Sequence, residues 1–148
     1  MIPFRPVALA AASVVVIAGG CSSDSAKTPV ALKLTEYAIT VDAPAVRTGK
    51  VKISAANIGG GKHEVVVLAT GDVGGLPTRD DGSLDEDKID AALKMGEVGE
   101  IEIGKSGSKS FDLKPGTYTV MCNLVDKNAD GTVVSHYAKG MTATFLVA

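Results

Sequence analysis

Alternating apolar and polar residues dominate the chain from Ala31 to its end, and this period of two predicts β-strands that each bury one face. The strands it predicts are residues 31–41, 51–57, a strand beginning at His63, and residues 98–103, 109–113, 116–122 and 141–147. Seventeen glycines and a hydrophobic content of 45% favour a folded, turn-rich β protein over a disordered chain.

Two places interrupt the alternation. In the first predicted strand the apolar positions are even up to Leu34 and odd from Tyr37 onward, which predicts a β-bulge between them. Between residues 71 and 95 the alternation is lost. There Ser83, followed three residues later by Glu86, has the spacing of a capping box and predicts a short helix.

The first twenty residues have the features of an export signal, so residues 1–20 are predicted to be a signal peptide. Arg5 supplies a positive charge, and the apolar run 7–18 is too short to span a membrane comfortably. The letters VIAGGC resemble a bacterial lipoprotein signal, although Ala18 stands where a larger aliphatic residue is usual. The resemblance implies lipidation of Cys21 and an exported protein anchored to the cell envelope.

The rest of the chain is predicted to form one domain, residues 30–148, joined to the anchor by a polar, flexible tether at residues 21–29. The formal net charge is −2, or −3 without Arg5, and no basic block is present. This charge distribution argues against nucleic acid as a partner. We expect a monomer that contacts the membrane only through its lipid.

Four residues with metal-binding side chains lie at or near the ends of predicted strands. His63, Cys122 and Met141 each stand at the end of their strand's apolar stripe, and His136 lies shortly before Met141. Two imidazoles, a thiolate and a weak thioether suit copper better than magnesium or calcium. Taken singly, each residue has a simpler explanation, because buried cysteines, histidines and methionines are common in protein cores.

Three motifs in order resemble the cupredoxins, the plastocyanin and azurin superfamily of small blue-copper proteins. They are N-x-G-G-x-K-H, then L-x-P-G-x-Y-x-x-x-C-N, then H-Y-x-x-G-M before a terminal strand. The resemblance implies an all-β, Greek-key β-sandwich, here with a short helical insertion. It also implies one type 1 copper ion with His63, Cys122 and His136 as equatorial ligands and Met141 as the axial ligand.

One departure from that family lies between Cys122 and His136. Small blue-copper proteins usually have a few residues there, whereas this chain has the polar segment 123–135. An Asp-Gly pair inside it predicts a hairpin extruded from the ligand loop. Copper nitrite reductases resemble the chain in having a longer loop.

The expected function is electron transfer with redox partner proteins of the cell envelope, without enzymatic activity. Both histidines are already assigned as ligands, and no serine, histidine and acid set is evident. Two alternatives stay open at this point. The domain could store or deliver copper, or it could be a copper-free scaffold used for binding.

Overall fold

The computed structural model describes residues 28–148. The predicted signal peptide, the lipidation site Cys21 and most of the predicted tether lie outside these residues. The first strand begins at Thr28, so the sandwich includes the last two residues of the segment predicted as a tether.

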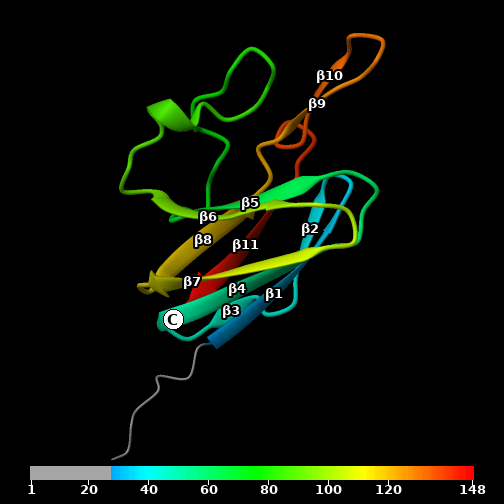
Figure 1. Cartoon of the computed structure of the whole chain (residues 1–148). Coiled ribbons are helices and arrows are strands. Elements are labelled where there is room, and N and C mark those ends of the chain that lie inside the picture. Colours follow the sequence, from blue (N-terminus) through cyan, green and yellow to red (C-terminus); the bar gives the residue numbers. More distant parts are fainter. Residues whose placement is uncertain (1–27) are drawn as a thin grey trace, which may run out of the picture.

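Two mixed sheets form a sandwich (Figure 1). The first sheet has the order β2-β1-β4-β7, with the strands β1 (Thr28–Thr35), β2 (Ala38–Val41), β4 (Gly49–Asn57) and β7 (Ser106–Leu113). The second has the order β3-β11-β8-β5-β6, with β3 (Ala45–Val46), β5 (His63–Leu68), β6 (Lys94–Ile101), β8 (Gly116–Met121) and β11 (Thr142–Val147). The pairs β1–β4 and β3–β11 are parallel, and the other pairs are antiparallel.

The core lies between the sheets and follows the alternation in the sequence. In β4, Val51, Ile53 and Ala55 are buried, and in β11 Phe145 and Val147 are buried. Each fully buried Val, Ile or Phe side chain contributes roughly 1.5–3 kcal/mol relative to an exposed one. The strands predicted from the pattern therefore form the all-β sandwich that the resemblance implied.

The interpretation of the first strand was wrong. Residues 31–41 do not form one bulged strand, because Thr35 pairs with Ala38 across a two-residue turn that reverses the chain. Tyr37, in that turn, has a φ of 60°, an uncommon angle for a residue other than glycine. The change of parity marks a hairpin, and no glycine or asparagine in the sequence signalled it.

The helical insertion is smaller than predicted. A single 3₁₀ turn, η1 (Glu86–Lys88), is the only helix in the described residues, and no side chain caps its start. Ser83 does not act as a cap, because its hydroxyl donates to Asp81 Oδ1 at 2.6 Å. Apolar side chains hold the insertion on the outer face of the second sheet, in a small cluster of Val66, Leu68, Leu84, Ile89 and Met121.

The predicted hairpin between Cys122 and His136 is present. It consists of β9 (Val125–Lys127) and β10 (Val133–Ser135), and it projects from one end of the sandwich (Figure 1). Gly131 in its turn has a φ of 83°, which glycine adopts without strain. Among residues 28–148, no helix is long and apolar enough to cross a membrane.

Candidate metal centre

Three of the four predicted ligands come together at the end of the sandwich where the hairpin projects. His63 is the first residue of β5, Cys122 follows β8, and His136 follows β10. One donor atom from each residue lies within 4.8 Å of the others. The exposed fractions of the three residues are 1%, 0% and 1%, so the cluster is closed to solvent.

Met141 is buried at the same end, held there by the backbone. Its N–H donates to His136 O at 3.0 Å, and its carbonyl accepts from Cys122 N–H at 3.1 Å. The turn between His136 and Met141 closes through Gly140, whose φ is 88°. Met141 thus lies opposite Cys122, just before the last strand, and its side chain is fully buried in the main core.

The spacing of the donor atoms fits a single metal ion. His136 Nδ1 lies 3.2 Å from His63 Nδ1 and 3.3 Å from Cys122 Sγ. An imidazole nitrogen lies about 2.0 Å and a thiolate sulfur about 2.3 Å from a bound zinc ion, so two such donors to one ion are at most about 4.3 Å apart. Both separations satisfy that limit. Two imidazoles and a thiolate suit zinc or copper, and a thioether in addition favours copper.

No protein-family model matches the sequence, and no curated protein is a significant match. Solved structures do match. Auracyanin from Roseiflexus castenholzii is 20% identical with a TM-score of 0.58, covering 82% of this chain and 98% of its own. Rusticyanin from Thiobacillus ferrooxidans is 17% identical with a TM-score of 0.54, covering 84% and 79%. Auracyanin A, described as a "blue" copper protein from Chloroflexus aurantiacus, is 18% identical with a TM-score of 0.52, covering 81% and 99%.

The chain has the cupredoxin fold. The resemblance inferred from the motifs is therefore confirmed at the level of the fold.

In this cupredoxin fold, a hydrogen-bonded network surrounds Cys122. The N–H of Glu64 donates to Cys122 Sγ at 3.4 Å, and the Glu64 carboxylate accepts from the N–H of Asn123 at 3.0 Å. Asn123 in turn binds the insertion: its side chain accepts from Leu84 N–H at 2.7 Å and donates to Leu84 O at 3.0 Å and to Glu86 Oε1 at 2.9 Å. These hydrogen bonds hold the segment 70–93 against Asn123, the residue that follows the candidate ligand Cys122.

The sequence did not reveal these roles of Glu64 and Asn123. Asn123 formed part of the C-N pair in the motif, but nothing in the sequence showed that its partners would lie in the insertion. The pKa of Glu64 is raised, chiefly by burial, although the hydrogen bond from Asn123 acts in the opposite direction.

The glycine turn at residues 59–61, just before His63, is held by hydrogen bonds to Asn57 and Glu36. Asn57 Nδ2 donates to Gly61 O at 2.8 Å, and Glu36 Oε1 accepts from the N–H groups of Gly60 and Gly61. A Cβ atom on Gly59 would lie 2.8 Å from Glu36 Oε1, so a larger residue there would displace that carboxylate. These contacts set the point at which the chain enters β5.

Burial favours the neutral forms of Cys122 and His63 when no metal is bound. It raises the pKa of the Cys122 thiol to about 11, and the N–H of Glu64 offsets only part of this effect. Burial also lowers the pKa of His63, and repulsion from His136 lowers it further. A metal ion that binds the sulfur must therefore displace the thiol proton.

The two imidazoles differ in their outer contacts. Within residues 28–148, the His63 Nε2 atom is buried and has no hydrogen-bond partner. His136 Nε2 lies 2.8 Å from Asp126 Oδ2, and the Tyr37 ring packs edge-on against the His136 ring with centroids 5.3 Å apart. Asp126 was not among the residues predicted from the sequence.

Proposed function

We propose that this chain is an electron-transfer protein that holds one type 1 copper ion through His63, Cys122, His136 and Met141. The observation that supports it most is the convergence of two imidazoles and a thiol in a buried cluster at one end of a cupredoxin fold. The blue-copper description of auracyanin A, which shares that fold, supports the same metal. A copper ion bound there would supply a one-electron change of oxidation state.

The residues of the chain contribute rigidity and exclusion of water. His63 and Cys122 are attached to neighbouring strands, β5 and β8, and the Glu64 and Asn123 contacts join those strands at the site. Donors held this firmly shift little when the charge at the site changes, which favours rapid electron exchange. Storage or delivery would require a site that opens to a partner, but the three donor residues are at most 1% exposed.

A copper-free scaffold leaves the cluster unexplained. A scaffold would gain nothing from a buried thiol beside two imidazoles, one of which has a nitrogen with no partner in the described chain. We also assign no catalytic reaction. Both histidines of the chain belong to the cluster, so neither imidazole is free to act as a general base.

The visible spectrum of the purified protein after addition of copper(II) tests this proposal. We expect an intense thiolate-to-copper absorption that Cys122→Ser abolishes while the β-sheet circular dichroism persists. Cys21→Ser is the matched control, because it removes the only other cysteine and should leave the absorption unchanged. Absorption that survives in Cys122→Ser would refute the ligand assignment, and a colourless copper(I) complex would favour delivery.

The cellular location is also a proposal and rests on the sequence. Residues 1–20 would direct export, Cys21 would carry a lipid that anchors the protein to the envelope membrane, and the monomeric domain would meet redox partner proteins there. Mass spectrometry of the mature protein should find a diacylated cysteine at its N-terminus, and Cys21→Ala should lack the lipid. An unmodified N-terminus elsewhere would refute the anchor.

A further inference from the structure

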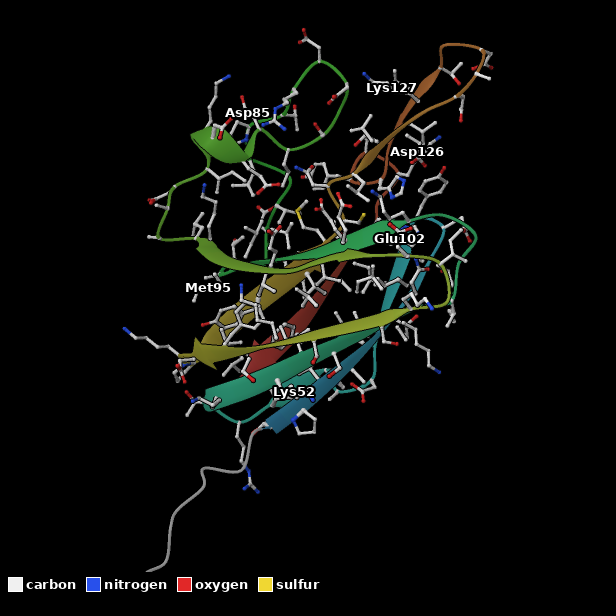
Figure 2. The ribbon with its side chains drawn as sticks, viewed as in Figure 1. Lys52, Asp85, Met95, Glu102, Asp126 and Lys127 are labelled. Carbon is white, nitrogen blue, oxygen red and sulfur yellow. The ribbon has the colours of Figure 1, made fainter. Side chains whose placement is uncertain are left out.

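The hairpin inserted into the ligand loop places a carboxylate behind the second histidine. Figure 2 shows Asp126 near the base of the hairpin, with Lys127 farther toward the tip. Asp126 Oδ2 lies 2.8 Å from His136 Nε2. The other ring nitrogen of His136 faces Cys122 Sγ at 3.3 Å, so the imidazole bridges the hairpin and the donor cluster.

Backbone pairing, rather than the side chain itself, determines where Asp126 lies. In the hairpin Asp126 pairs with Val134, and the neighbouring pair is Val125 with Ser135, the residue before His136. The N–H of His136 also donates to Leu124 O at 3.0 Å, which extends the ladder to the ligand. The carboxylate is therefore held against the imidazole by a register that does not depend on their hydrogen bond.

The contact also determines which nitrogen of His136 carries hydrogen. A carboxylate oxygen accepts, so Nε2 donates, and in the neutral imidazole Nδ1 then has a lone pair directed at Cys122 and His63. Carboxylates that accept from the outer nitrogen of a metal-bound histidine fix the ring and make it a stronger donor. His63 receives no such support in the described part of the chain.

We propose that Asp126 is a positioning residue of the metal site: it fixes His136 with Nδ1 toward the metal and, by its negative charge, favours copper(II) over copper(I). This inference rests on the proposed function. It assigns the inserted hairpin a role in setting the reduction potential, in addition to lengthening the loop.

Voltammetry and NMR on the full chain test the proposal with a graded pair of substitutions. Asp126→Asn keeps an acceptor but loses the charge, and Asp126→Ala loses both. In each, the affinity for copper(II) relative to copper(I) should fall about tenfold, which raises the one-electron potential by about 59 mV. In the zinc-loaded protein, the His136 Nε2–H signal should be protected from solvent exchange in the parent and in Asp126→Asn, and lose that protection in Asp126→Ala.

Asp130→Asn is the matched control. Asp130 lies in the turn of the same hairpin, and within residues 28–148 its carboxylate bonds only to Thr132, so the substitution makes the same charge change away from His136. It should leave the potential and the Nε2–H signal unchanged. Equal potentials in the parent protein and Asp126→Asn would overturn the role of Asp126, and so would an equal shift of the potential in Asp130→Asn. If the parent protein still showed the thiolate-to-copper absorption, the copper site itself would be upheld. A parent protein without the thiolate-to-copper absorption would overturn both.

Discussion

The two histidines of the site are held by different kinds of structure. His63 opens β5 within the five-stranded sheet, pairs with Ile101 in β6, and follows a glycine turn that Glu36 and Asn57 tie down. His136 lies outside both large sheets and depends on the inserted hairpin and on Asp126. Both reach an exposed fraction of 1%, which shows that an insertion can close a site as completely as a sheet does.

Removing each imidazole in turn gives the largest expected effect. His63→Ala and His136→Ala should each weaken copper(II) binding by more than about 100-fold, because changes to residues that only support a ligand already cost 10–100-fold. Competition titrations with a chelator measure this loss. If His136→Ala bound copper as tightly as the parent protein, His136, the histidine that follows the hairpin, would not be a copper ligand.

The Cys122 thiol, which lies beside the two histidines in the cluster, predicts that the stability of the metal-free protein depends on pH. The Cys122 pKa is about 11 in the folded chain against an ordinary value of 9.0, so unfolding releases a proton above pH 9. The stability from this difference is full below pH 9 and is lost as the pH rises to 11, by at most about 3 kcal/mol. Urea unfolding from pH 8 to pH 11 measures it, and Cys122→Ser should lack this part of the decline. A parallel decline in both proteins would show that the thiol is not responsible.

Asparagines on the two sides of the site provide a matched test of stability. Asn123→Ala should lower the free energy of unfolding by about 2 kcal/mol, because the buried N–H of Leu84 loses its acceptor. Asn128→Ala, in the hairpin turn, removes only an exposed bond to Thr132 and should cost less than about 0.5 kcal/mol. Chemical denaturation of the metal-free variants measures both losses of stability. Equal losses would mean that the hairpin turn is as important to stability as the contact between Asn123 and the segment that contains Leu84.

The smallest effect is expected at Met141. A weak axial ligand tunes the potential more than it holds the metal, so Met141→Leu should raise the potential and keep the intense absorption. Copper(II) affinity should change by less than about tenfold. An unchanged potential would show that Met141 is only a core residue that precedes β11.

The sequence predicted the part of the site that the large sheet supplies, His63 and Cys122, better than the part that the hairpin supplies. Period-two alternation placed His63 and Cys122 at the ends of their stripes, and the structure brings them together. The hairpin itself was predicted from its Asp-Gly pair, but its register was not. A carboxylate such as Asp126 in a polar loop resembles any solvated residue until the register shows what it faces.

The errors elsewhere have similar physical causes. Tyr37 adopts a positive φ that its side chain does not favour, so local sequence rules gave no sign of the turn. Ser83 and Glu86 had the spacing of a capping box, yet Asp81 competes for the Ser83 hydroxyl and only one 3₁₀ turn forms. Tertiary contacts such as those of Asn123 join segments far apart in the sequence, and one sequence alone does not reveal them.

X-ray absorption at the copper edge of the copper-loaded protein tests the ligand set most directly. We expect one sulfur and two imidazole nitrogens at short distance from the copper, with the sulfur lost in Cys122→Ser and one nitrogen lost in His136→Ala. A first shell of oxygen and nitrogen without sulfur in the parent protein would contradict this ligand set, because the copper would then lie outside the buried cluster.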